Sequence, residues 1–257
     1  MSLKNLIKKI VLGMKSLRRP SVAYCANHGL LPSVFVRTPT AQLRGLLLLP
    51  ESPYTTQLNQ DIFALLANRF RPGFFVEIGA NDGFTLSNTV YLEEHFGWNG
   101  LLVEANPQYV DNLKKRKAKS VIAAVVDKEG HYEFCSAGLY GGVAAHLDKT
   151  HEERTQHASS ITVWGTTLEK ILEEGDAPAV VSFISIDVEG AEVSIVEQMC
   201  KLRNYRFACG CIEYNARQAD YQRIAHLLQE SGYSIVWEWQ TQHDLFFVDK
   251  RGLGADG

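Results

Sequence analysis

The stretch Phe74–Gly83, FFVEIGANDG, decides the predicted fold, because an apolar run passes directly into a loop that contains two glycines. The run predicts a buried first β-strand, and the loop predicts a tight turn from that strand into a helix. Gly79 and Gly83 can adopt backbone angles that are closed to other residues, and they let a ligand approach the main chain. The stretch therefore predicts a cofactor site of the nucleotide-binding type.

The loop departs from the dinucleotide-binding fingerprint G-x-G-x-x-G, because Asn81 and Phe84 stand where its second and third glycines would be. A pyrophosphate ligand is therefore disfavoured. Glu77, two residues before the first glycine, suits a ligand that carries positive charge or hydroxyl groups. S-adenosylmethionine carries both, in its amino group, its sulfonium and its ribose. Taken alone, the loop is equally compatible with a tight turn that has no ligand.

A second apolar strand, within residues 98–107, ends in another carboxylate, Glu104. In a right-handed βαβ unit both strand ends emerge at the same edge of the sheet, so we expect Glu104 beside the glycine loop. There its carboxylate can accept both ribose hydroxyls, the alternative being a solvated residue at a strand end. Asn106 and Pro107 then end the strand and start a helix, whose basic residues at 114–119 are expected on a solvated face.

A third run, residues 180–192, is continuously apolar before it ends in clustered carboxylates. Continuous apolar character is typical of a parallel strand that is buried on both faces, and ligands bind at the carboxyl ends of such strands. We expect Asp187 to face the group that is transferred. Glu189 and Glu192 stand at the start of the next helix, where negative charge is favourable, so a structural role is open for either or both.

The rest of the chain alternates strand and helix patterns. Further strands are predicted at 120–126, which ends in Asp127, and at 131–135, 161–163 and 207–214, and helices at 57–70, 87–96, 167–174 and 219–231. A hairpin-like pair of strands, 233–239 and 245–249, closes the pattern. The polar segment 136–160 is predicted to be a surface loop or lid, and its histidines, His146, His151 and His157, match no metal motif.

Composition limits the cellular setting. Among the 257 residues are five cysteines, an odd number without a C-x-x-C pair, which favours free thiols in a reducing compartment and hence a cytoplasmic protein. The net charge is −3, yet residues 1–50 contain eight basic residues and no acid. The remainder is therefore acidic, which argues against nucleic acid as a partner.

The basic end carries apolar residues at helical spacing over residues 3–17, with lysines on the other face. Such a helix is too short and too charged to span a bilayer. Two roles stay open: peripheral contact with the inner face of a membrane, or packing on the domain or on a second subunit. We expect a basic amphipathic helix at 1–19, a linker or cover segment at 20–54, one catalytic domain at 55–250 and a tail at 251–257.

Alternating strands and helices that finish in a hairpin are typical of a class I methyltransferase. That fold is a Rossmann-like α/β structure with a seven-stranded, mostly parallel sheet, an antiparallel last strand and helices on both faces. Residues 77–83, 103–107 and especially 186–192 resemble the FkbM family of S-adenosylmethionine-dependent O-methyltransferases, and the resemblance spans about residues 55–250.

The resemblance implies roles for the residues of these motifs. It places the methionine part of S-adenosylmethionine against Glu77 and the loop of Gly79, Ala80, Asn81, Asp82 and Gly83. It places the ribose against Glu104, with Ala105 and Asn106 beside it, the adenine near Asp127, and the transfer site at Asp187. It also implies the acceptor, a hydroxyl of a sugar, a glycan or glycolipid, or a related natural product.

A hydroxyl acceptor is weakly acidic, so its deprotonation needs a general base or a divalent metal. Our candidates for the catalytic residues are Asp187, Glu213 and His243, because the terminal hairpin returns to the ligand edge. The same three residues could bind magnesium or manganese, but their separation along the chain matches no ligand spacing, so no metal is expected.

Two other classes of function are compatible with the same fold. An NAD-dependent oxidoreductase or epimerase would share the glycine loop and the ribose acid. It should also show a second loop glycine and a Tyr-x-x-x-Lys pair, which the sequence lacks. A non-catalytic binding protein could keep the fold after losing activity.

Overall fold

Seven strands form the central sheet of the computed structural model, which describes residues 52, 56–136, 141–144, 159–238 and 243–251. Their order across the sheet is β12-β13-β11-β9-β1-β2-β3. The strands are β1 (Phe74–Ile78), β2 (Asn99–Glu104), β3 (Lys119–Ile122), β9 (Phe183–Ile186), β11 (Cys209–Glu213), β12 (Tyr233–Val236) and β13 (Asp244–Asp249). β13 runs antiparallel to both β11 and β12, whereas the other neighbours are parallel. The predicted seven-stranded sheet with an antiparallel last strand is confirmed.

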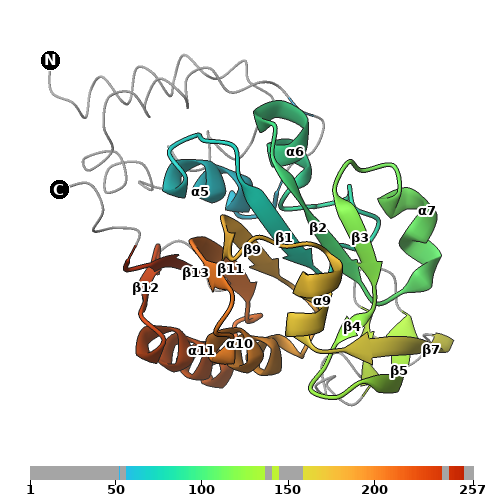
Figure 1. Cartoon of the computed structure of the whole chain (residues 1–257). Helices are drawn as coiled ribbons and strands as arrows, with labels where there is room; N and C mark the ends of the chain where they lie inside the picture. Colours follow the sequence, from blue (N-terminus) through green and yellow to red (C-terminus); the bar gives the residue numbers. More distant parts are fainter. Residues whose placement is uncertain (1–51, 53–55, 137–140, 145–158, 239–242, 252–257) are drawn as a thin grey trace, which may run out of the picture.

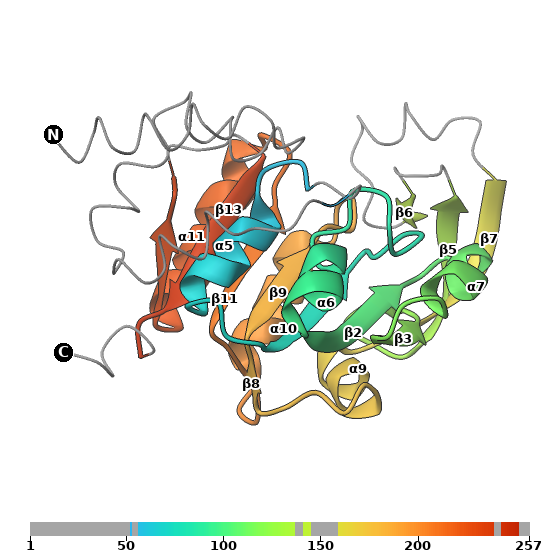
Figure 2. The ribbon, with the colours of Figure 1, turned by 90° about the horizontal axis from the view of Figure 1, so that it is seen from above.

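Helices cover both faces of the central sheet (Figure 1), and the buried residues of the two faces form separate apolar clusters. Phe75 packs in a cluster with residues of α5 (Gln60–Ala67), α6 (Val90–Phe96) and α7 (Val110–Leu113). Val76 packs in another cluster with residues of α9 (Leu168–Glu174), α10 (Glu192–Lys201) and α11 (Gln218–Glu230). Figure 2 shows α5 and α6 together against one side of the sheet. Burial on both faces explains why these strands are continuously apolar and lack alternation.

The strand order of the sheet reverses at β1, which has β2 on one side and β9 on the other. The chain builds outward from β1 through β2 to β3, and it then returns to place β9 on the other side of β1. The carboxyl ends of β1, β2, β9 and β11 therefore meet at one edge, where a ligand crevice opens in sheets of this kind. This arrangement brings together the three motifs that the sequence analysis singled out.

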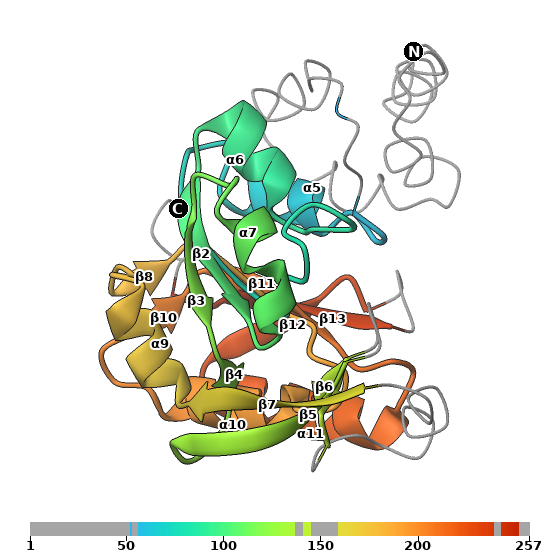
Figure 3. The same ribbon diagram turned by 90° about the vertical axis from the view of Figure 1, so that its right-hand side faces the viewer.

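The strand predicted at 120–126 is interrupted, which corrects the sequence analysis. Residues of β3 pair with β2 only as far as Ile122, opposite Glu104, where β2 itself ends. β4 (Ala124–Val125) instead pairs with β7 (Ser159–Thr166) in a second sheet of order β4-β7-β5-β6. The other members of that sheet are β5 (Gly130–Ser136) and β6 (Gly142–Val143), and Figure 3 shows this sheet leading on from the end of β3.

Two other predicted strands are each divided in the same way. β8 (Val180–Val181) precedes β9, and β10 (Arg206–Phe207) precedes β11; β8 and β10 pair with each other outside the central sheet. Among the helices and strands described, no helix has the length and apolar character needed to cross a membrane. The expected helix at 3–17, the three histidines of 136–160 and the tail from 252 lie outside the described residues.

Candidate functional site

Two adjoining cavities lie at the carboxyl edge of the sheet. A narrow cleft of about 60 Å³ extends between the ends of β1 and β2 and the second sheet. A wider cavity of about 350 Å³ opens toward β11 and the residue before β13. The two share five lining residues, Ile78, Gly79, Asn81, Asp187 and Glu189. The motifs of residues 77–83 and 186–192 thus form the boundary between the two spaces.

Gly79 is required by the close approach of two chain segments. Its φ is +86°, and a Cβ on it would lie 1.7 Å from the carbonyl oxygen of Asp187. The amides of Gly79 and Ala80 both donate to the carbonyl of Val103, at 2.9 and 3.0 Å. The glycine therefore lets the ends of β1, β2 and β9 converge at the boundary of the cavities.

Glu104 joins the glycine loop to the turn after β2. Its two carboxylate oxygens accept hydrogen bonds from the amides of Asn81, at 2.8 Å, and Asn106, at 2.7 Å. Burial raises the pKa of Glu104, and these hydrogen bonds act in the opposite direction. Each oxygen keeps a second lone pair that can accept from a ligand hydroxyl. Glu104, Ala105 and Asn106 all line the narrow cleft, as a ribose site there requires.

Glu77 lines the wider cavity, but its carboxylate already has three donors within the chain. It accepts from the Ser87 hydroxyl at 2.9 Å, the Asn88 amide at 2.7 Å and the Thr89 hydroxyl at 2.5 Å. Burial raises its pKa, opposed by the charge of Arg116 and by these hydrogen bonds. Contact between Glu77 and the methionine part of a cofactor stays a prediction.

Asp82, Gly83 and Asp127 lie outside the lining of both cavities. Asp82 caps its own turn, accepting from the amides of Phe84 and Thr85 at 2.8 and 2.7 Å. Asp127 is exposed and accepts from two side chains of α10, those of Ser194 and Gln198. In place of Asp127, the neighbouring residues Ala123, Ala124 and Val125 line the cleft, so its far end is apolar.

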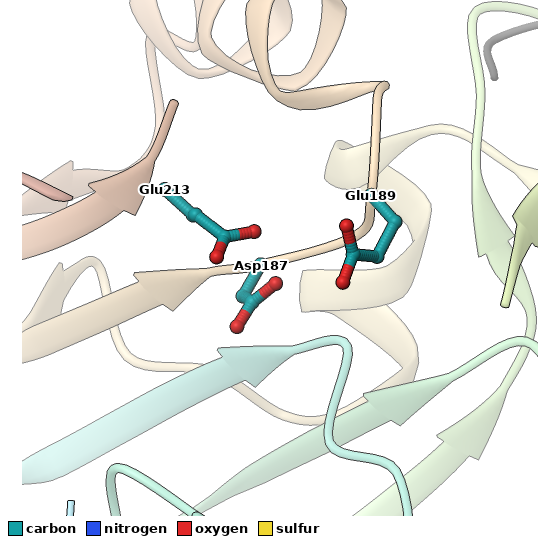
Figure 4. Close-up of side chains that lie close together, drawn as sticks. All are labelled: Asp187, Glu189 and Glu213. Atoms are coloured by element: carbon teal, nitrogen blue, oxygen red, sulfur yellow. The ribbon is translucent and has the colours of Figure 1, made fainter. Parts of the chain in front are cut away.

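Three carboxylates gather where the cavities meet (Figure 4). One oxygen from each of Asp187, Glu189 and Glu213 lies within 4.8 Å of the others. Asp187 follows β9, Glu213 ends β11, and Glu189 has a left-handed backbone with φ 61°. A non-glycine residue in that conformation is costly and is held there by its surroundings. The cluster contains two of the expected catalytic residues and adds Glu189.

The carboxyls of Asp187 and Glu213 are neighbours that affect each other's pKa through a hydrogen bond. Burial, with repulsion from Glu213, raises the pKa of Asp187 well above its usual value. Burial also raises the pKa of Glu213, to about 7. Both shifts favour retention of a proton by the pair near neutral pH. Such a pair can accept one proton from a bound acceptor.

His243 and Asp244 both line the wider cavity. Glu213 and Asp244 are directly paired across β11 and β13, which confirms that the hairpin returns to this edge. His243 is exposed and stands apart from the three-carboxylate cluster. Asp244 accepts from the Gln60 amide at 2.8 Å, and burial raises its pKa to about 6.

The open question about the two acids after Asp187 is resolved by their contacts. Glu192 is buried and accepts from the amides of Val188, at 3.1 Å, and Gly190, at 3.0 Å. Arg217 donates to it as well, at 3.0 Å. Glu192 therefore fixes the loop before α10, whereas Glu189 lines both cavities.

Arg116 was expected on a solvated face, and that expectation is wrong. The neighbouring Lys114, Lys115, Lys117 and Lys119 are exposed, but the Arg116 side chain is only 1% exposed. Its partners come from segments 23 to 33 residues earlier in the chain, so no local pattern reveals its burial.

Comparison with known proteins identifies the family of the chain. A sequence model of the methyltransferase FkbM domain matches residues 77–235, which confirms the resemblance drawn from the motifs. No curated protein matches the chain.

Solved structures with a similar arrangement include three methyltransferases. An O-methyltransferase from Bacillus cereus in complex with SAH is 14% identical, with a TM-score of 0.43 over 86% of this chain and 96% of that one. A precorrin-6y C5,15-methyltransferase from Geobacter metallireducens is 15% identical, with a TM-score of 0.41 over 73% and 85%. A methyltransferase FkbM from Methylobacillus flagellatus is 12% identical, with a TM-score of 0.40 over 88% and 60%. At these scores the family assignment rests on the sequence match.

Proposed function

The chain belongs to the FkbM methyltransferase domain family, and on that premise we propose that it transfers a methyl group from S-adenosylmethionine to a hydroxyl. The proposed acceptor is a sugar, a glycan or glycolipid, or a related natural product. One observation carries the proposal: the close carboxylates of Asp187 and Glu213 line a wider polar cavity, and Asp187 also lines the adjoining cleft that contains Glu104.

The residues of the narrow cleft fit a nucleoside in their chemistry. Glu104 has lone pairs left for ribose hydroxyls, and the apolar side chains of Val103, Val125 and Phe134 suit the faces of an adenine. The free space of the cleft, about 60 Å³, is below the roughly 300–1,000 Å³ of ligand pockets, and the cleft adjoins the wider cavity along five shared residues. Bound S-adenosylmethionine would supply a methyl group activated by its sulfonium.

The residues of the wider cavity fit a hydroxyl-rich acceptor. Its volume of about 350 Å³ lies within the range of ligand pockets, and amide side chains from several segments line it: Gln57, Gln60, Asn88 and Asn215. Amides both donate and accept hydrogen bonds, as hydroxyl groups do. The polar lining supports an oxygen acceptor.

The carboxylate pair supplies the proposed general base. Ionised Glu213 would accept the proton of the acceptor hydroxyl, while Asp187 keeps its own proton and donates a hydrogen bond to Glu213. A base whose pKa of about 7 matches neutral pH transfers protons efficiently. Rate also depends on the alignment of the acceptor oxygen, which the cavity walls would provide. His243, at the exposed side of the cavity, is the remaining candidate.

Transfer of label tests the proposal. The full chain would be incubated with S-adenosylmethionine labelled in its methyl group and with monosaccharides, glycolipids and polyketide-type alcohols. We expect label on a hydroxyl oxygen of at least one acceptor. Label found only on carbon or nitrogen would contradict O-methylation, and cofactor binding without transfer to any acceptor would support the non-catalytic alternative.

A further inference from the structure

We infer that Arg116 is a positioning residue, which with Glu77 fixes residues 83–89 as a preformed wall of the wider cavity. Arg116 and Glu77 would keep residues 83–89 rigid, and the effect of this rigidity on cofactor binding rests on the proposed function. Four residues of the segment, Thr85, Leu86, Ser87 and Asn88, line that cavity.

The charge of Arg116 is neutralised in the interior by Glu93 of α6. Arg116 Nε lies 3.1 Å from Glu93 Oε1, and the two side chains are 1% and 3% exposed. Glu93 also accepts from the amides of Lys117, at 3.0 Å, and Ala118, at 2.9 Å. The turn before β3 is thereby fastened to α6, and the guanidinium is left with its two terminal nitrogens for other partners.

Those two nitrogens reach three points of the cavity wall. Nη1 donates to the carbonyl of Gly83 and to the Ser87 hydroxyl, the latter at 3.3 Å, and Nη2 donates to the Thr89 hydroxyl at 3.1 Å. A planar guanidinium presents its donors in a fixed fork, so it holds these three acceptors in one geometry. A lysine could replace the charge opposite Glu93 but could not span the three.

Glu77 holds the same two hydroxyls from the other side. Ser87 and Thr89 each accept from Arg116 and donate to the Glu77 carboxylate. Both hydroxyl orientations are therefore fixed, and the Asn88 amide between them also donates to Glu77. The side chain of Asn88 then donates to Ser185 of β9 at 2.9 Å, two residues before Asp187.

The wall needs such support because of its backbone. Leu86 has φ 58° and is 40% exposed, so a non-glycine residue sits in a left-handed conformation beside the cavity. Strain of this kind persists only where neighbouring contacts impose it. The contacts of Arg116 and Glu77 on both sides of Leu86, at Gly83 and at residues 87–89, supply that constraint.

The test compares Arg116→Lys with Arg223→Lys, a matched control at an exposed ion pair with Glu197. Amide hydrogen exchange of residues 84–89 is measured relative to β2, together with affinity for S-adenosylhomocysteine and the melting temperature. We expect Arg116→Lys to exchange about tenfold faster at 84–89, as loss of buried hydrogen bonds predicts, with β2 unchanged. It should also bind S-adenosylhomocysteine about tenfold more weakly, because Arg116 holds the carbonyl of Gly83, the end of the glycine loop that the family resemblance places against the methionine part of the cofactor. Arg223→Lys should match the wild type.

Unchanged exchange at 84–89 in a folded Arg116→Lys protein would overturn the inference. If that variant does not fold, the same exchange measurement is made on Thr89→Val, which removes a hydroxyl between Arg116 and Glu77 without loss of a side-chain cap of α6. Faster exchange at 84–89 supports the inference, and unchanged exchange overturns it. If the wild type binds no S-adenosylhomocysteine, the proposed function fails, and the exchange comparison alone decides the role of Arg116.

Discussion

Asp187 and Glu213 show how the fold sets the chemistry of single residues. Each is an ordinary carboxyl at the end of a strand, and the sheet order brings the two together because β9 and β11 are neighbours. Burial then raises both pKa values; the neighbouring Glu213 raises that of Asp187 further, whereas the hydrogen bond with Asp187 lowers that of Glu213. The sequence alone could place both residues at one edge, but their effect on each other's pKa depends on their separation in space.

Glu213→Gln should remove the proposed base. We expect kcat to fall by about 10²- to 10⁴-fold, the usual contribution of general base catalysis. In the wild type, kcat/KM should rise as the pH increases through about 7, because the base must be ionised, and level off above that. The variant should lose this rise, while Glu230→Gln at the exposed end of α11 should keep both rate and profile. If Glu213→Gln turned over at the wild-type rate, Glu213 would not be the general base.

Gly79→Ala should destabilise the fold far more than Gly97→Ala. Both glycines have positive φ, +86° and +66°, so both substitutions carry the cost of that conformation, about 1 kcal/mol or more. Only at Gly79 would the added Cβ meet backbone, the Asp187 carbonyl, whereas nothing lies within 4 Å at Gly97. Urea unfolding measures the difference, and equal losses in the two variants would contradict the convergence of strands at Gly79.

At the scale of elements, the strands could be predicted where apolar runs are long and end in glycine or an acid. β1, β2 and β9 fall within their predicted runs, since burial on both faces leaves a continuous signal in the sequence. The division of the predicted strand 120–126 after Ile122 is not visible in the sequence. β4 is apolar like β3, and only the change of partner from β2 to β7 separates them. The family resemblance placed Asp127 near the adenine, at the end of one predicted strand that is in fact two.

Side-chain contacts between distant elements could not be predicted. In the sequence, Arg116 is one of five basic residues within 114–119, and nothing there sets it apart from the exposed lysines. Its burial depends on contacts with Gly83, Ser87, Thr89 and Glu93. Glu189 and Glu192 likewise stand three residues apart in one motif. Their different roles follow from which one faces the amides of the loop.

The amphipathic pattern of residues 3–17 makes a prediction at this scale. If these residues contact an anionic membrane surface, the full chain should float with liposomes that contain acidic lipids, and a chain lacking residues 1–19 should not. High salt should weaken the flotation, because the attraction of lysines to the surface is screened. Equal partitioning of the two chains would rule out membrane contact and favour packing on the domain or on a second subunit.

At the scale of the whole molecule, the reversal of the sheet at β1 unites the site. The reversal puts Glu104 on one side of the glycine loop and Asp187 on the other, so a cofactor cleft and an acceptor cavity share one boundary. An NAD-dependent enzyme would share the fold and the ribose acid. The loop around Asn81 distinguishes the methyltransferase from the NAD-dependent enzyme. It lacks the second glycine, which would let a pyrophosphate come close to the backbone.

Titration calorimetry of the full chain with S-adenosylmethionine and, separately, with NAD tests which cofactor the site binds. We expect saturable binding of S-adenosylmethionine, weakened in Glu104→Gln because an amide cannot accept from both backbone N–H groups and a ribose as the carboxylate can. We expect no binding of NAD at the same concentrations. Tight binding of NAD without binding of S-adenosylmethionine would contradict the proposed function.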